Sequence, residues 1–344
     1  WIFYALMKTG KYVSIGTQFN RFPRTQRTQI QCTNTNSGQS TSRMNRHLNI
    51  RLAAIVVALT IISCSCNSRK NGVNQTSPNL RFITHNVWYG FSKVPERKEI
   101  WIMWMNEQDP DIVALQELNG YTEQILADDA RSYGHAYSAL LKEEGFPTGI
   151  TSRFPIEDIQ RIREGFHHGL MRVKIQGIYI YVIHLHPSNW ETRMLEINQI
   201  LQDIETLPQD AKVILAGDFN TFSPLDSVYY SHGRLEPFFK DRDSLYEEKN
   251  LNNGKLEYSV IQKVMDVGLI DLEASLRISS YSFSGSFPTL IEKEGEHGDQ
   301  RRLDYVFASK NLVKKVTKAK IITTDTTFIL SDHLPMVVDL DPDK

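Results

Sequence analysis

Carboxylates, amides and imidazoles follow several apolar segments of this sequence. Gly217-Asp218-Phe219-Asn220 comes directly after the apolar run 212–216, and Ser331-Asp332-His333 lies more than a hundred residues later. A carboxylate and an amide two residues apart at the end of a strand point to the same side. Together they could hold a phosphate, a metal ion or an attacking water.

Four further apolar segments end in side chains of the same kinds: Asn86, Glu117, His184 and Asp304. Each has an ordinary explanation when taken alone, because a polar residue after a strand is commonly a turn residue, a solvated strand end or a satisfied histidine. Six such ends in one chain favour a shared site. Hydrolysis of a phosphate ester needs a hard cation with oxygen ligands, a base for water and donors for the developing charge, and this set could supply each.

The elements that must position these residues alternate between short apolar runs and amphipathic segments. Helical spacing of apolar residues predicts helices at 96–108, 190–207 and 260–267. Apolar runs predict strands at 80–87, 111–117, 136–141, 149–151, 170–175, 178–184, 213–216, 303–308, 316–323 and 336–340. The polar stretch 223–257 reads as a loop-rich excursion over the active face. Mixed hairpins and strand–helix units predict one α/β domain, 80–344, with two packed mixed sheets flanked by helices.

Charge is distributed unevenly along the chain. Residues 1–79 contain ten Lys or Arg and no acid, so the remainder has 29 basic and 40 acidic residues, a net charge of −11. A basic surface is the usual mark of nucleic-acid binding, and the predicted domain lacks that excess. All three cysteines lie before the domain, which therefore uses neither disulfides nor thiolate chemistry.

The first 79 residues read as an export signal with its flanks. Residues 44–64 combine a short basic region, an eleven-residue apolar run and a terminal Cys64, the proportions of a secretory signal. The run is too short to span a bilayer comfortably, which takes about 20 apolar residues. Residues 1–43 are polar and without periodicity, so we expect disorder or upstream translated sequence, and 65–79 read as a polar tether. The alternative for the apolar run is a buried strand or helix.

Taken together, these motifs resemble the endonuclease/exonuclease/phosphatase family over residues 80–341. They occur in the family's order: Asn86, Gln116-Glu117, the His184 strand, Asp218-Phe219-Asn220, Asp304-Tyr305 and Ser331-Asp332-His333. Residues 148–156 also resemble its Ser-Arg-aromatic-Pro-Ile stretch. The resemblance implies a deoxyribonuclease I-like fold of four layers. The segment ending in Cys64 resembles the lipobox of bacterial lipoproteins, which implies a lipid-anchored protein of the cell envelope.

The resemblance also implies a role for each site residue. Glu117 would be the main Mg²⁺ ligand, helped by Asn86 and Asp332, with Mn²⁺ as a possible substitute. Asp218 would orient or deprotonate the attacking water, and Asn220 would bond a phosphate oxygen. His333, held by Asp304, would contact the scissile phosphate, and His184 would stabilise the transition state.

Other features leave alternatives open. His184 and His186 have the spacing of paired zinc ligands, but the Asp-His expected after them is absent, which disfavours zinc. Trp88-Tyr89 could line the pocket or simply pack, and Arg153 could bind phosphate or form a structural salt bridge. His167-His168 reads as a loop pair, whereas Trp101 and Trp104 have the spacing of core residues.

Three functions are compatible with these observations. The first is a monomeric Mg²⁺-dependent phosphoesterase that hydrolyses a phosphodiester or phosphomonoester, such as a small organic phosphate or a lipid headgroup. The second is an extracellular nuclease, because scavenged nucleic acid is also met outside the cell. The third is a binding protein that keeps the fold without its chemistry, which the complete set of site residues disfavours.

Overall fold

The computed structural model describes residues 79–231, 233–247, 249–277, 283–291, 296–341 and 343–344. The expected upstream segment 1–43, the signal 44–64 with Cys64, and the tether up to residue 78 lie outside the described residues. Among the residues that are described, no helix is long and apolar enough to cross a membrane.

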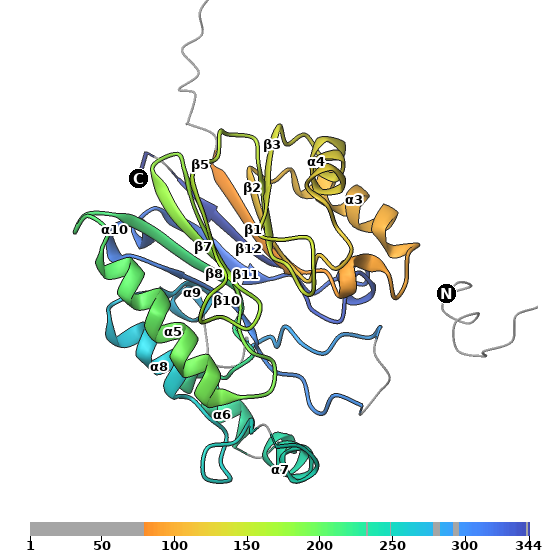
Figure 1. Ribbon diagram of the computed structural model, residues 1–344, viewed down its shortest axis with the longest axis vertical. Helices are drawn as coiled ribbons and strands as arrows, with labels where there is room; N and C mark the ends of the chain where they lie inside the picture. Colours follow the sequence, from red (N-terminus) through yellow and green to blue (C-terminus); the bar gives the residue numbers. More distant parts are fainter. Residues whose placement is uncertain (1–78, 232, 248, 278–282, 292–295, 342) are drawn as a thin grey trace, which may run out of the picture. The chain divides into compact units, whose positions relative to one another are not determined.

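Two six-stranded mixed sheets form the centre of the domain, as predicted (Figure 1). The first sheet has the order β11-β12-β1-β2-β4-β3, with β1 Leu80–Asn86, β2 Ile112–Gln116, β3 Tyr137–Leu140, β4 Gly149–Ser152, β11 Val316–Ile321 and β12 Met336–Leu340. The second has the order β5-β6-β7-β8-β10-β9, with β5 Glu157–Ile162, β6 Leu170–Ile175, β7 Ile178–His184, β8 Lys212–Asp218, β9 Ile270–Asp271 and β10 Asp304–Ala308. Each sheet has one parallel pair, β1 with β2 and β7 with β8.

Helices cover the outer face of each sheet. Helices α3 Arg97–Gln108 and α4 Glu123–Ser132 lie on the first sheet, and α5 Trp190–Glu205 and α8 Ser259–Asp266 lie on the second (Figure 1). Further helices occupy the connections: η1 Tyr89–Phe91, η2 Pro224–Asp226, α6 Ser227–Tyr230, α7 Leu235–Leu245, α9 Leu272–Leu276, α10 Lys310–Val313 and η4 Thr327–Ile329. The arrangement has four layers, as expected.

Three apolar cores hold these layers together. Alternate residues of both sheets, such as Ala114, Val182 and Val338, pack in the core between the sheets. The opposite faces pack under helices, with Trp101 and Trp104 of α3 buried against the first sheet and Ile197 of α5 buried against the second. The two tryptophans are therefore core residues, as predicted. Burial on both faces explains why the central strands are continuously apolar.

The longest departures from the sequence prediction are α4, β5 and α7; the short elements α6, β9, α9 and α10 were not predicted either. The stretch 223–257 contains the helix α7, because Leu235 and Phe239 lie one turn apart and pack with Phe222, so the loop-rich interpretation was wrong there. The sequence analysis also missed α4 and β5. Only Leu126 and Ala130 of α4 are buried, and the edge strand β5 has no buried residue, so neither element shows a strong apolar pattern.

Candidate active site

Strand register brings three predicted catalytic residues to one end of the second sheet. His184 is paired with Asp218 across β7 and β8, and Asp304 is paired with Asp218 across β8 and β10. Paired residues point to the same face, so the three buried side chains converge. Strand β8 can approach β7 this closely because residue 217 is glycine. A Cβ there would lie 2.1 Å from the carbonyl oxygen of Ile183.

Asn86 joins this group to the first sheet. The parallel pairing of β1 with β2 sets Asn86 opposite Gln116, which brings Glu117 beside it. The Asn86 amide nitrogen donates to Glu117 Oε1 and to Asp218 Oδ2, both at 3.1 Å. One amide therefore bridges carboxylates of two sheets, and the site lies where the ends of the sheets meet.

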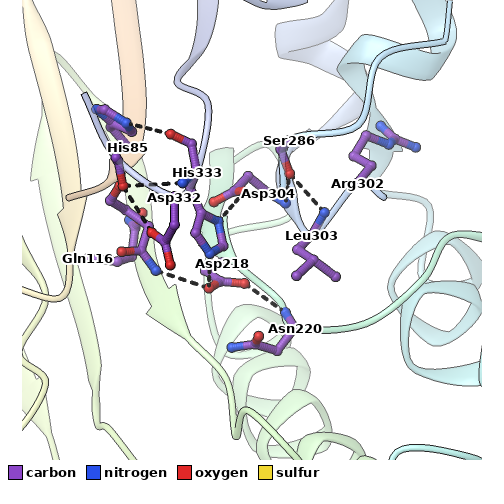
Figure 2. Close-up of polar contacts among 12 residues, drawn as sticks. His85, Gln116, Asp218, Asn220, Ser286, Arg302, Leu303, Asp304, Asp332 and His333 are labelled. Carbon is purple, nitrogen blue, oxygen red and sulfur yellow. Dashed lines mark hydrogen bonds and ion pairs between the residues drawn. The ribbon is translucent and has the colours of Figure 1, made fainter. Parts of the chain in front are cut away.

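Asp304 and His333 form a carboxylate–imidazole pair beside Asp218. Asp304 Oδ2 lies 2.7 Å from His333 Nδ1, and the other ring nitrogen lies 3.7 Å from Asp218 Oδ2 (Figure 2). Ser286 Oγ accepts hydrogen bonds from the backbone N–H groups of Leu303 and Asp304, which fixes the start of β10. His333 is thus held between two carboxylates, and Asp304 orients its ring.

The charges of this group favour a protonated His333 and an Asp218 that titrates near neutrality. Burial by itself would lower the pKa of His333, but the carboxylates of Asp304, Asp218 and Asp332 outweigh it and raise the pKa to about 10. Burial also raises the pKa of Asp218 to about 7. The cation of His333 opposes this rise, and the charges of Asp304 and Glu117 add to it. A carboxyl with such a pKa can accept a proton near pH 7.

We expect a bell-shaped dependence of kcat/KM on pH. The acid limb would follow ionisation of Asp218, at or below about pH 7 because a bound cation lowers the pKa of a nearby carboxyl. The alkaline limb would follow loss of the His333 proton near pH 10. Steady-state rates from pH 5 to 11 at saturating metal measure both limbs, and a flat profile would contradict this division of labour.

His184 faces the carboxylates as a neutral imidazole. Its Nε2 lies 3.6 Å from Asp218 Oδ2 and 4.0 Å from Glu117 Oε1. Burial holds the pKa of His184 well below its usual value, and the nearby His168 and His333 lower it further. The buried Nδ1 has no hydrogen-bond partner among the described residues, so the proton belongs on Nε2, where it points toward the acids. This geometry suits donation to an oxygen that gains negative charge.

Glu117 and Asp332 offer the oxygen ligands that Mg²⁺ prefers. Glu117 is half-buried, and its Oε2 accepts the Tyr89 N–H at 3.0 Å. Asp332 is buried, and its Oδ1 accepts the Ser331 hydroxyl at 3.1 Å. Burial raises the pKa of Tyr89, and the charges of Glu117 and Asp332 add to this rise, so both carboxylates act on the Tyr89 side chain. This donor set fits a hard divalent cation, which would supply charge for the phosphate oxygens and a lowered pKa for water.

Asn86 has a different orientation from the one a metal ligand needs. Its Oδ1 accepts the Trp88 N–H at 3.0 Å, and its nitrogen faces the two carboxylates. Asn86 therefore orients Glu117 and Asp218 in this arrangement, and its amide would have to rotate for the predicted ligand role.

Asp218, Asp304 and His333 form a different candidate group, whose ligand atoms all lie within 4.8 Å of one another. The close contact of His333 Nδ1 with Asp304 commits that nitrogen to a proton, because the imidazole is cationic. A metal needs a free nitrogen lone pair. In this arrangement the group is suited to proton chemistry, and a cation bound by His333 would have to displace its proton.

Asn220 lies beside Asp218 at the end of β8. Its backbone N–H donates to Asp218 Oδ1 at 2.9 Å, and its amide nitrogen donates to the Leu185 carbonyl oxygen at 3.1 Å. The left-handed backbone of Asn220, φ 51°, turns the chain sharply after the strand, and Glu117 has a similar φ of 58°. Such φ values are uncommon outside glycine and concentrate at functional sites. The second N–H of the Asn220 amide stays available for the predicted phosphate contact.

Two sequence features lie outside this arrangement. Arg153 forms ion pairs with Asp109 and Asp111 and follows the end of β4 that pairs with the start of β2, away from Glu117. It therefore forms a structural salt bridge. His186 Nδ1 accepts two backbone N–H groups, so its Nε2 carries the proton in the neutral ring. This geometry disfavours a zinc role, in agreement with the sequence prediction.

Sequence reasoning missed two histidines that support the site. His168 lies in the loop of the β5–β6 hairpin, as predicted, but the sequence did not show that it is buried and that its ring stacks on His184 with centroids 4.2 Å apart. His85 was not singled out. It accepts the Trp101 indole N–H on Nδ1 and therefore donates from Nε2 to the His333 carbonyl oxygen at 3.1 Å. The position of His85 directly before Asn86 was the available signal.

Two stacked sheets bring oxygen ligands suited to a hard cation close to a histidine–aspartate pair. This combination is typical of metal-dependent hydrolases of phosphate esters. The family comparison agrees, because residues 83–333 match the model of the Endonuclease/Exonuclease/phosphatase family. The chain belongs to this family, and its activity is hydrolysis of phosphate ester bonds. A search of curated proteins finds no match.

Solved structures share the fold at low sequence identity. An AP endonuclease from Archaeoglobus fulgidus superposes with a TM-score of 0.56 at 20% identity, covering 76% of this chain and 99% of that one. A variant of the 3' phosphatase NExo from Neisseria, bound to product DNA hairpin, superposes with a TM-score of 0.54 at 16% identity. The match covers 76% of this chain and 99% of that one. Humanized D. rerio TDP2 superposes with a TM-score of 0.51 at 19% identity, covering 76% of this chain and 98% of that one.

Proposed function

We propose that this protein is a Mg²⁺-dependent phosphoesterase that hydrolyses a phosphodiester or phosphomonoester by attack of water. The observation that supports this most is the Asn86 amide, which bridges the Glu117 and Asp218 carboxylates at 3.1 Å each. It places the acid proposed to bind the cation beside the acid proposed to act on water.

The remaining groups divide the work around the scissile phosphate. Asp218 accepts the proton of the attacking water. His333, kept cationic by Asp304, donates a charge-assisted hydrogen bond to a phosphate oxygen, and neutral His184 donates from Nε2 to another. Asn220 holds a third oxygen through its side-chain amide. Mg²⁺ on Glu117 and Asp332 would neutralise charge that develops on the phosphate.

A substrate panel tests this proposal. The purified domain, residues 79–344, would be assayed with bis-p-nitrophenyl phosphate, p-nitrophenyl phosphate, sphingomyelin and plasmid DNA, with EDTA, Mg²⁺ or Mn²⁺. We expect EDTA to abolish turnover of at least one substrate and Mg²⁺ to restore it. If no substrate turned over at saturating metal, the non-catalytic binding protein would become the better hypothesis.

Nuclease activity is the second candidate, and one observation favours it. The half-buried rings of Tyr89 and Phe146 lie next to the Glu117–His184 region with centroids 5.2 Å apart, and the Lys93 ammonium lies 4.4 Å above the Tyr89 ring. Aromatic rings with nearby lysines stack bases and neutralise phosphates of single strands. Preference for single-stranded DNA over bis-p-nitrophenyl phosphate, lost on Phe146→Ala, would favour this candidate.

Export and lipid attachment at Cys64 complete the proposal. They rest on the basic, apolar and cysteine-terminated order of residues 44–64. We expect the full chain expressed in bacteria to incorporate radiolabelled palmitate and to sediment with membranes. The Cys64→Ser variant should do neither, with Cys66→Ser as the matched control. Equal labelling of both variants would contradict attachment at Cys64.

A further inference from the structure

Arg97 is a buried cation that forms no ion pair among the residues the structure describes. It begins helix α3 and is 2% exposed. Within the described part of the chain, its hydrogen bonds go to the backbone carbonyl oxygens of Val87, Trp88 and Leu330, and its Nε has no partner. A cation in the first turn opposes the helix dipole, and burial lowers the pKa of Arg97 to about 10. The position therefore weakens the helix, which points to a role outside it.

The carbonyls that Arg97 holds belong to two segments far apart in the sequence. Val87 and Trp88 directly follow Asn86, and Leu330 lies two residues before Asp332. The Nη1 atom donates to both segments, to the Val87 oxygen at 2.8 Å and to the Leu330 oxygen as well. One planar guanidinium thus connects the segment beside Glu117 with the segment that contains Asp332.

The segment after Asn86 has an unusual backbone that needs such support. Four consecutive residues, 88–91, have positive φ angles of 52°, 54°, 58° and 65°. Only one of them, Gly90, is a glycine, so this left-handed turn is strained. Arg97 holds its carbonyl side and stacks on the rings of Trp88 and Phe91, at 5.1 and 5.0 Å.

The amide side of the same turn faces the proposed cation site. The N–H groups of Tyr89 and Gly90 donate to Glu117, to Oε2 at 3.0 Å and to the backbone oxygen at 2.6 Å. On the other segment, Ser331 Oγ lies 2.7 Å from the Asn86 carbonyl oxygen and 3.1 Å from Asp332 Oδ1, and its single proton is shared between these two acceptors. A shift of either segment would therefore move a carboxylate.

We propose that Arg97 is a positioning residue for the metal. By holding the backbone of both segments, it sets the separation of Glu117 and Asp332 and so determines Mg²⁺ affinity. This inference rests on the proposed function of those two carboxylates. Residues that orient metal ligands typically change affinity about 10- to 100-fold when replaced. The geometry of the guanidinium matters here, because a lysine keeps the charge but cannot donate in a plane to three carbonyls.

Isothermal titration of the metal-free domain with Mg²⁺, without substrate, tests the proposal. We expect Arg97→Lys to raise the Mg²⁺ Kd about 10-fold, with kcat at saturating Mg²⁺ reduced much less. Arg193→Lys is the matched control, since Arg193 is equally buried, also has an unpartnered Nε and donates to the His186 carbonyl oxygen. Its Mg²⁺ Kd should equal that of the wild type.

Charge and geometry make opposite predictions. If only the positive charge mattered, Arg97→Lys would bind Mg²⁺ like the wild type and Arg97→Gln would bind it more tightly. That result would overturn the inference and leave the proposed function intact. If the wild-type domain itself bound no Mg²⁺, the proposed function would fail first.

Hydrogen exchange of the wild type covers the case in which the variants do not fold. If Arg97 fixes the turn at residues 88–91, the Tyr89 and Gly90 amides should already be protected from exchange without metal, and Mg²⁺ should add little protection. Free exchange of these amides in the metal-free protein, followed by strong protection on adding Mg²⁺, would show that the metal orders the turn. That outcome would overturn the role of Arg97.

Discussion

Replacing Asp218 by Asn should lower kcat about 10³-fold with little change in KM, because the variant keeps the shape of the side chain and loses the base. Asp218 is buried, its pKa lies at about 7, and its Oδ2 lies within 3.7 Å of both His184 and His333. Another group cannot easily take over, since burial keeps His184 a weak base and His333 holds its proton. Steady-state hydrolysis of the best substrate at saturating Mg²⁺ measures the effect. Asp241→Asn, at an exposed position of α7, is the surface control.

The stability of the same variant separates lost chemistry from lost folding. A carboxyl whose pKa is raised on folding contributes most stability below its unfolded pKa, near 3.8, and loses it as pH rises through about 7. At pH 8 the neutral Asn avoids this loss. We therefore expect Asp218→Asn to melt at the same temperature as the wild type or higher. An inactive variant that melts well below the wild type would not support a base role.

Replacing His333 by Ala should lower kcat by a similar factor, about 10³-fold, because it removes a cationic donor from a buried site. The change also leaves Asp304 and Asp218 without the cation between them, so the variant should be less stable at pH 7. The His333 contribution to stability is fully present below pH 6.5 and is lost as pH rises through about 10. Activity at saturating metal, measured well below the variant's melting temperature, gives the catalytic effect.

Asp304→Asn is the informative partner of this variant. His333 Nδ1 loses its carboxylate at 2.7 Å, so its pKa should fall from about 10 toward the usual value. The alkaline limb of the pH profile should move to lower pH, and the loss of activity should be larger at pH 9 than at pH 6. Identical pH profiles for the wild type and Asp304→Asn would show that Asp304 does not control the protonation of His333 during catalysis.

The sequence predicted the central strands well, because they are buried on both faces and read as apolar runs. It predicted α3, α5 and α8 for a related reason, since each carries an apolar stripe at helical spacing. It failed where burial is partial. Helix α7 buries only Leu235 and Phe239, and β5 is a polar edge strand, so neither has a pattern that a single sequence can show.

The site shows the same division between sequence and structure. The chain by itself indicated which residues to expect in the site: Asn86, Glu117, His184 and Asp218 end apolar runs, and Asp304 and His333 stand before them. Their types predicted the reaction class, and the family match agrees.

Only the tertiary structure decided how these residues are arranged. The pairing of β7, β8 and β10 aligns His184, Asp218 and Asp304, and the meeting of the two sheets lets Asn86 bridge carboxylates more than a hundred residues apart. Burial raises the pKa of Asp218, whereas carboxylates from other segments raise the pKa of His333 against the effect of burial. Arg97 shows the limit most clearly: as a letter it is one more basic residue, and only its three carbonyl partners connect it to the proposed metal site.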